Sequence, residues 1–115
     1  MTVPEILDYV VITMMEISHE LEMDAVFQLE LQGEPSETYQ LIIKGKRIEW
    51  LTGKPMKATC TIQVSHEHFI KLVEGNLNPT TALLTGKIKI WGDRTQLIKL
   101  QSLLSKDSIE LPWLF

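Results

Sequence analysis

The chain has little cysteine, little positive charge and no long apolar run. Cys60 is the one cysteine among 115 residues, which excludes an internal disulfide framework and is compatible with a reducing compartment. Eleven basic against fifteen acidic side chains give a formal net charge of −4, whereas a nucleic-acid-binding domain normally carries a basic stripe. No stretch approaches the roughly 18 consecutive apolar residues of a membrane span, and no secretory or carboxyl-terminal targeting signal is recognisable. We therefore expect a cytoplasmic protein with no integral membrane segment and no nucleic-acid partner.

Motifs of catalysis are also missing. The sequence contains no G-x-S-x-G elbow, phosphate-binding glycine loop or dinucleotide fingerprint. His66 and His68 are two residues apart on a predicted helix, so their side chains point about 200° apart and cannot share a metal ion there. A solvated helix start is the favoured interpretation for both. Cys60 lies on the apolar face of a predicted strand, where a buried structural role is expected. We predict no enzyme activity, no metal and no cofactor.

What is present is the composition of an ordinary globular domain. Hydrophobic residues make up 44% of the chain and charged residues 23%, which excludes a disordered or fibrous protein. The length fits a single domain, 1–115, with one core. Within it, residues 107–115 form an apolar carboxyl-terminal tail that Pro112 keeps from being a regular helix.

The hydrophobic periodicity alternates between helix and strand. A three- to four-residue spacing over 4–21 predicts a helix, and two-residue alternation predicts strands near 25–32, 39–43, 48–50, 59–64 and 87–91. Further helices are expected after the N-cap residues Ser65, Asn78 and Asp93, with Gly75 ending the first of these. Three short connections predict an antiparallel meander of the first four strands. The order helix, four strands, two helices, strand, helix indicates an α+β domain with helices covering one face of a sheet.

Apolar residues also occur on the minor face of several predicted strands. Ile42, Leu51 and Trp91 each lie opposite the main apolar face of their strand. One interpretation is that helices and tail cover both sheet faces, or that these are edge residues. The other is that they surround an apolar cavity for a large ligand.

A set of segments in the second half of the chain resembles the sterol carrier protein 2 (SCP2) family. The segments are Ala58–Ser65, Phe69–Gly75, Asn78–Pro79, Ala82, Gly86–Ile90 and Gly92–Asp93. Their order and spacing are more specific than any one of them. The resemblance implies a stand-alone SCP2-like domain: a five-stranded, mostly antiparallel sheet with helices on one face, enclosing a hydrophobic tunnel. It also implies non-catalytic binding and transfer of a fatty acid, fatty acyl-CoA, sterol or related lipid.

By position in that fold, ten residues are expected to line the tunnel. They are Trp50, Phe69, Ile70, Val73, Leu83, Leu84, Trp91, Leu104, Trp113 and Phe115. The last two belong to the tail, which is too apolar to remain in water as a group. We expect Trp113 and Phe115 to cover one tunnel mouth or to pack inside it.

One other function stays open beside lipid transfer. Bulky Trp91 and the aromatic tail are compatible with an accessory protein-interaction module whose tunnel is filled or vestigial. In that case the tail would dock into a partner subunit of a homodimer. The sequence leaves the bound lipid, the oligomeric state and any partner enzyme undetermined.

Overall fold

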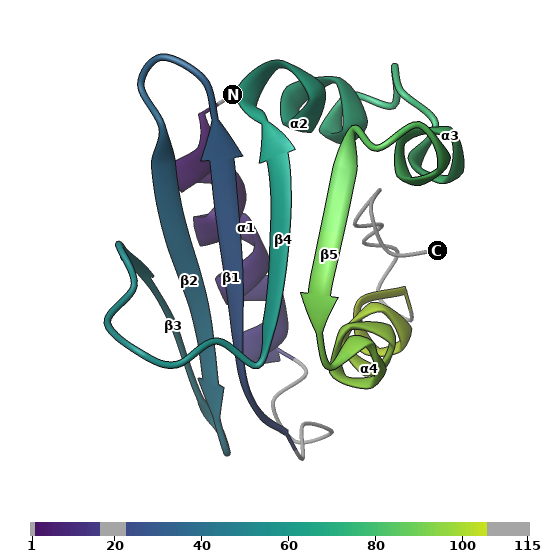
Figure 1. Ribbon diagram of the computed structural model, residues 1–115. Helices are drawn as coiled ribbons and strands as arrows, with labels where there is room; N and C mark the ends of the chain where they lie inside the picture. Colours follow the sequence, from purple (N-terminus) through teal and green to yellow (C-terminus); the bar gives the residue numbers. More distant parts are fainter. Residues whose placement is uncertain (1, 17–22, 106–115) are drawn as a thin grey trace.

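The computed structural model describes residues 2–16 and 23–105, without the side chains of residues 101 and 103–105. Helices and strands follow one another in the predicted order (Figure 1). They are α1 (Val3–Glu16), β1 (Asp24–Gln32), β2 (Glu37–Lys44), β3 (Arg47–Thr52), β4 (Cys60–Ser65), α2 (His66–Val73), α3 (Pro79–Leu84), β5 (Ile88–Gly92) and α4 (Arg94–Ser105). No helix in these two ranges is long and apolar enough to cross a membrane. The predicted tail 107–115 lies outside the described residues.

The strands form one mixed sheet in the order β3-β2-β1-β4-β5. The pairs β1–β2, β2–β3 and β4–β5 are antiparallel, which confirms the mostly antiparallel five-stranded sheet. The predicted meander is wrong at its fourth strand, because β4 pairs in parallel with β1. In Figure 1 the connection after β3 crosses in front of β2 and β1 before it enters β4. Short loop length alone does not distinguish such a crossing from a hairpin.

The crossing segment is fixed by hydrogen bonds to two strands. The side chain of Gln40 in β2 accepts from the backbone N–H of Met56 at 3.1 Å and donates to the Met56 carbonyl at 2.8 Å. Thr59 then donates its N–H to the Val26 carbonyl at 2.8 Å, and its hydroxyl accepts from the Val26 N–H at 2.9 Å. These contacts place the chain beside β1, where the parallel pairing begins.

One face of the sheet carries the core, and the period-2 pattern decides which residues face it. Phe27, Leu29 and Leu31 of β1 and Leu41 and Ile43 of β2 are all buried. Helix α1 lies behind the strands in Figure 1 and turns its buried stripe toward them. Helices α1 and α4 both contribute side chains to a cavity over this face, as expected for helices that cover one side of a sheet.

Local signals position the later helices as predicted. Ser65 caps α2 by accepting from the His68 N–H at 3.0 Å, and Asn78 caps α3 by accepting from the Thr81 N–H at 3.1 Å. Asp93 accepts from the Thr95 N–H at 2.9 Å at the start of α4. Such caps satisfy backbone donors that have no partner inside the helix. Gly75 follows α2 with φ +79°, the left-handed conformation in which glycine commonly ends a helix.

Candidate functional site: an apolar cavity with a polar end

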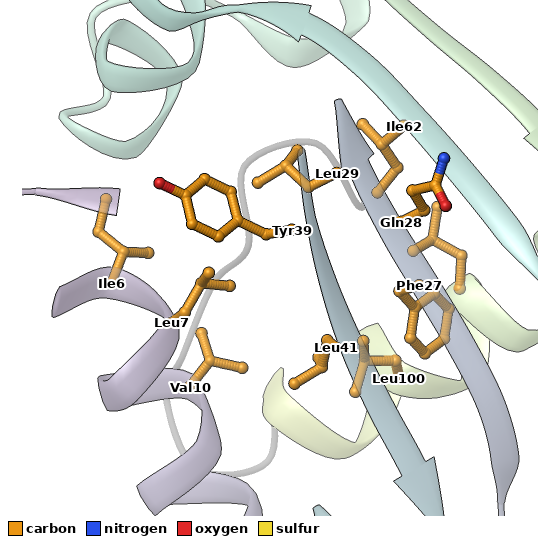
Figure 2. A pocket seen from close by; sticks show the side chains of 11 residues that line it. Ile6, Leu7, Val10, Phe27, Gln28, Leu29, Tyr39, Leu41, Ile62 and Leu100 are labelled. Carbon is orange, nitrogen blue, oxygen red and sulfur yellow. The ribbon is translucent and has the colours of Figure 1, made fainter. Parts of the chain in front are cut away.

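A cavity of about 40 Å³ lies between helices α1 and α4 and the inner face of the sheet. Its lining comprises Ile6, Leu7, Val10, Phe27, Gln28, Leu29, Tyr39, Leu41, Ile62, Leu97 and Leu100. Figure 2 shows aliphatic and aromatic side chains from α1, β1, β2 and α4 around one space. Nearly all of this lining is apolar, so the cavity favours hydrocarbon over water. Ligand pockets generally measure about 300–1,000 Å³, so a lipid could enter only if the walls move apart.

Tyr39 connects this cavity, which exposes only apolar atoms, to a polar end that lies just outside its lining. The side chain is 5% exposed, and its ring meets the Trp50 ring edge-on, with centroids 5.8 Å apart and planes at 63°. Its hydroxyl donates a hydrogen bond to the Glu37 carboxylate. Burial, together with this bond, raises the pKa of Tyr39 to about 12. The phenol therefore stays protonated at neutral pH, where it acts as a donor to Glu37.

Glu37 connects Tyr39 to the start of α2. Its other carboxylate oxygen, Oε1, lies 3.6 Å from Nε2 of His66. That nitrogen is buried and has no hydrogen-bond partner among the described residues. The side chains as wholes are 36% exposed for Glu37 and 32% for His66, so the pair sits near the surface. The predicted solvated position of His66 is therefore only partly correct, because one ring nitrogen is shielded from water.

Tyr39 also borders a hollow on the protein surface. That hollow has a volume of about 390 Å³ and is lined by Glu37, Thr38, Tyr39, Thr52, Gly53 and Lys54. Most of its lining residues are polar or charged, although the area they expose to the hollow is mostly apolar. Tyr39 belongs to both linings, so the inner cavity and the surface hollow adjoin at this residue.

The residues predicted to line a tunnel are distributed differently. Phe69 is fully buried in the core, while Trp50, Ile70, Val73 and Leu83 are partly buried against it. None of these five borders the described cavity. They pack around the same core, and their role as ligand-binding walls stays a prediction.

Leu84 and Trp91 require a correction. Leu84 is 83% exposed and Trp91 49% exposed, so neither is a wall of the cavity. The short helix α3 buries only Ala82 and turns Leu84 outward, and Trp91 lies on the minor face of β5, opposite the face that buries Ile88. The Leu104 side chain, Trp113 and Phe115 lie outside the described residues.

Elsewhere the described chain offers little reactive chemistry. Cys60 is 1% exposed, and burial raises the pKa of its thiol, which makes the nucleophilic thiolate scarce. In the part of the chain that the structure describes, no cluster of three histidine, cysteine, aspartate or glutamate side chains could hold a metal ion.

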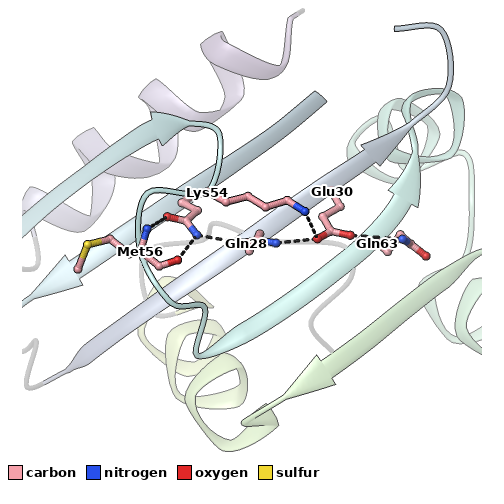
Figure 3. A network of polar contacts seen from close by, with 6 residues as sticks. Gln28, Glu30, Lys54, Met56 and Gln63 are labelled. Carbon is pink, nitrogen blue, oxygen red and sulfur yellow. Dashed lines mark hydrogen bonds and ion pairs between the residues drawn. The ribbon is translucent and has the colours of Figure 1, made fainter. Parts of the chain in front are cut away.

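The opposite face of the sheet carries a polar network. Gln40 donates to Gln28 at 2.8 Å, and Gln28 donates to Glu30 at 2.6 Å. Glu30 also accepts from Gln63 at 3.3 Å and pairs with Lys54 at 3.6 Å. Figure 3 shows these side chains running across neighbouring strands and ending at the Met56 backbone. The side-chain amides find hydrogen-bond partners within this network. The bonds from Gln40 to the Met56 backbone hold the crossing segment in place.

Sequence reasoning missed Glu37, Tyr39 and the shielded atom of His66. One signal was available, since Glu37 and Tyr39 share a strand face with Leu41 and Ile43, which places an acid at the end of an apolar row. Nothing in the sequence indicated that His66 would stand beside them, because that contact depends on how α2 leaves the sheet.

Comparison with known proteins gives a consistent result. The SCP-2 sterol transfer family matches residues 21–105. Hydroxysteroid dehydrogenase-like protein 2 of Bos taurus is 36% identical over 88 residues, covering 76% of this chain and 21% of the relative. The Rattus norvegicus protein of the same name is 38% identical over 82 residues, covering 70% of this chain and 16% of the relative. The chain thus spans about a fifth of the length of these relatives.

Solved structures share the fold at low sequence identity. The sterol carrier protein domain 2 of Helicoverpa armigera has a TM-score of 0.72 and 21% identity, covering 89% of this chain and 84% of that one. Palmitated SCP2L2 from Aedes aegypti has a TM-score of 0.69 and 20% identity, covering 90% and 95%. A chain of the sec-alkyl sulfatase PisA1 reaches a TM-score of 0.73 at 17% identity, but only 16% of it is covered.

Proposed function

The chain belongs to the SCP-2 sterol transfer family, and we propose that it binds and transfers an elongated apolar ligand without chemical conversion. The ligand class comprises fatty acids, fatty acyl-CoA, sterols and related lipids. Family membership supports lipid binding in general, and a structural relative described as palmitated supports an acyl chain as one possible ligand form. The dehydrogenase name of the curated relatives belongs to much longer proteins, of which the match covers only 21% in the Bos taurus case, so it supports no oxidoreductase activity for this chain.

The observation that carries the proposal is the apolar cavity between α1, α4 and the sheet. Burial of an acyl chain there supplies about 0.8 kcal/mol for each CH₂ removed from water. The cavity as described is too small for a long chain, so binding requires α1 or α4 to move away from the strands. Phe69, Ile70, Val73 and Leu83 pack in or against the same core, and their predicted role as tunnel walls is part of this proposal.

Extraction of the protein expressed in cells tests this proposal most directly. Mass spectrometry of the organic extract is expected to detect a lipid in stoichiometric amount. The delipidated protein is then expected to take up a fluorescent fatty acid or fatty alcohol, with a change in intrinsic tryptophan fluorescence. A protein that yields no lipid and takes up neither probe would contradict the proposal.

The small cavity favours a second candidate function, an accessory interaction module with a filled or vestigial tunnel. At about 40 Å³ the cavity is well below the size of most ligand pockets. Exposed apolar residues on α1, namely Tyr9, Ile12 and Met15, are compatible with contact to another protein. Light scattering of the delipidated protein separates the two candidates, since a stable dimer with no lipid uptake favours this module.

The predicted tail has a place in both proposals. As a lid, residues 109–115 would put Trp113 and Phe115 over one mouth of the tunnel. Their deletion would then speed ligand exchange and leave the oligomeric state unchanged. As a docking segment, the tail would hold a homodimer together, and its deletion would give a monomer with unchanged ligand exchange.

We place the protein in the cytoplasm on the basis of its single cysteine and its excess of acidic over basic side chains.

A further inference from the structure

The polar end of the cavity provides a basis for discriminating between ligand headgroups. Glu37 uses one carboxylate oxygen to accept from Tyr39. The second oxygen faces Nε2 of His66 across 3.6 Å, a separation too long for a hydrogen bond. The nitrogen is buried without a partner in the described part of the chain. A buried polar atom of this kind normally has a hydrogen-bond partner, from protein, water or ligand.

A hydroxyl group matches the two unused positions. Its oxygen can accept a hydrogen bond from the His66 ring when the ring carries its proton on Nε2, and its hydrogen can be donated to Oε1 of Glu37. A carboxylate could accept from His66, but it would place a second negative charge beside Glu37. An ester could accept from His66 but has no hydrogen to donate. The geometry therefore ranks three headgroups that share one apolar chain.

The other charges near this end do not cancel the effect of Glu37. Lys54 lines the adjoining surface hollow, but its side chain is 62% exposed and pairs with Glu30 at 3.6 Å. Asp8, which accepts from the Trp50 indole at 2.7 Å, adds a further negative charge near Tyr39. The charges at the polar end are thus negative, apart from Lys54, which is exposed and already paired with Glu30.

We propose that Glu37, Tyr39 and His66 form a headgroup subsite that selects an apolar ligand ending in an uncharged hydroxyl over one ending in a carboxylate. Tyr39 lines the apolar cavity and its hydroxyl bonds to Glu37, so it is the link between the cavity and the two polar side chains, which lie outside the cavity lining. Glu37 is the discriminating group, and His66 is the donor that any oxygen headgroup uses. This inference rests on the proposed function, since it assumes that the cavity takes an apolar chain.

Three probes with the same hydrocarbon chain test the subsite: 1-dodecanol, methyl dodecanoate and dodecanoate. Dissociation constants are measured with the delipidated full chain near pH 8, where dodecanoate is ionised. The expected order of affinity is dodecanol, then methyl dodecanoate, then dodecanoate. The first is expected to bind about tenfold more tightly than the last, the value of one charge-assisted hydrogen bond.

Two pairs of variants assign that order to the named residues. Glu37→Gln is expected to reduce the preference for dodecanol over dodecanoate to about threefold or less, because the repulsion is lost. Glu49→Gln removes the same charge from an exposed position on β3 and is expected to leave the preference unchanged. His66→Ala is expected to weaken both uncharged probes about threefold or more, whereas His68→Ala, on the same helix, leaves them unaffected.

The outcomes distinguish this inference from the proposed function. If all three probes bind with equal affinity to the wild type and to Glu37→Gln, the cavity is a lipid site but the headgroup subsite is refuted. The same conclusion follows if Glu49→Gln changes the preference as much as Glu37→Gln, because bulk charge would then explain it. If no probe binds, the proposed function fails and the subsite fails with it.

Discussion

The indole N–H of Trp50 donates to Oδ1 of Asp8 at 2.7 Å and thereby ties edge strand β3 to helix α1. The same ring packs edge-on against Tyr39, so one side chain connects the helix to the polar end of the cavity. Movement of α1 away from the sheet, which the proposed binding requires, would break this bond. The Asp8–Trp50 pair is therefore expected to influence both stability and access to the cavity.

The energy of this contact is measurable in a double-mutant cycle. Asp8→Ala and Trp50→Phe are each expected to lower the free energy of unfolding, and together they are expected to show a coupling energy of about 1 kcal/mol. Urea unfolding of the four proteins gives the value. Strictly additive effects would mean that the hydrogen bond contributes nothing. In the same series, Asp8→Ala is expected to speed ligand entry.

Filling the cavity is expected to block an apolar ligand. Val10 lines the cavity, so Val10→Phe places extra carbon atoms in its space and is expected to weaken dodecanol binding about tenfold or more. Val11→Phe makes the same change at the neighbouring, half-buried position outside the lining and serves as the control. Both variants are expected to stay folded, with overpacking at Val10 costing about 1–3 kcal/mol. Equal binding by the two variants would place the ligand elsewhere.

Alkaline pH is expected to destabilise the protein through Tyr39. Burial first, and then the bond to Glu37, raise its pKa to about 12, above the value of about 10 for a tyrosine in an unfolded chain. The folded state thus holds the phenolic proton more tightly. Its contribution to stability is fully present below about pH 10 and is lost as the pH rises through 12.

The chain has two tyrosines, so Tyr9→Phe leaves Tyr39 as the only phenol. Its ultraviolet absorbance during an alkaline titration then reports Tyr39 alone, and a midpoint near 10 would contradict the raised pKa. Tyr39→Phe is expected to remove this part of the alkaline destabilisation.

Gly92 is expected to tolerate no side chain. A Cβ there would lie 2.4 Å from the Thr59 carbonyl oxygen, and φ is +95°. Gly75→Ala is the matched control, because Gly75 has φ +79° but open space around it. Left-handed backbone costs about 1–2 kcal/mol in either variant. Gly92→Ala is expected to lower the free energy of unfolding further, by disrupting the contact between Thr59 and the β5–α4 turn. Equal losses in thermal unfolding would show that the backbone there relaxes freely.

The parts of the fold that depend on neighbouring residues are predictable from the sequence. Periodicity places the strands and helices, and Ser65, Asn78 and Asp93 mark helix starts because capping involves residues only two or three positions apart. The position of β4 depends on a long-range choice between the edge strand β3 and the central strand β1. Short connections suggest that β4 pairs with β3, whereas the hydrogen bonds of Gln40 and Thr59 hold it beside β1.

The candidate site was harder to predict for the same reason. Phe69 and Ile70 were correctly placed at the core by their helical spacing, but spacing does not reveal which core residues border a void. Leu84 is the last residue of a six-residue helix that buries only Ala82, and so short a helix gives little periodicity to read. The Tyr39–Glu37–His66 arrangement joins two elements that are distant in the sequence.

The buried Gln40 amide has a consequence for how the strands find their partners. It is fully shielded and makes hydrogen bonds to Gln28 and to both backbone groups of Met56. If β2 slipped by one residue along β1, this amide would turn toward the apolar helices, and all three bonds would be lost. A misaligned β1–β2 hairpin would thus lose the Gln28 bond at once and the Met56 bonds when the crossing segment arrives, so the network on the outer face disfavours incorrect strand pairing during folding.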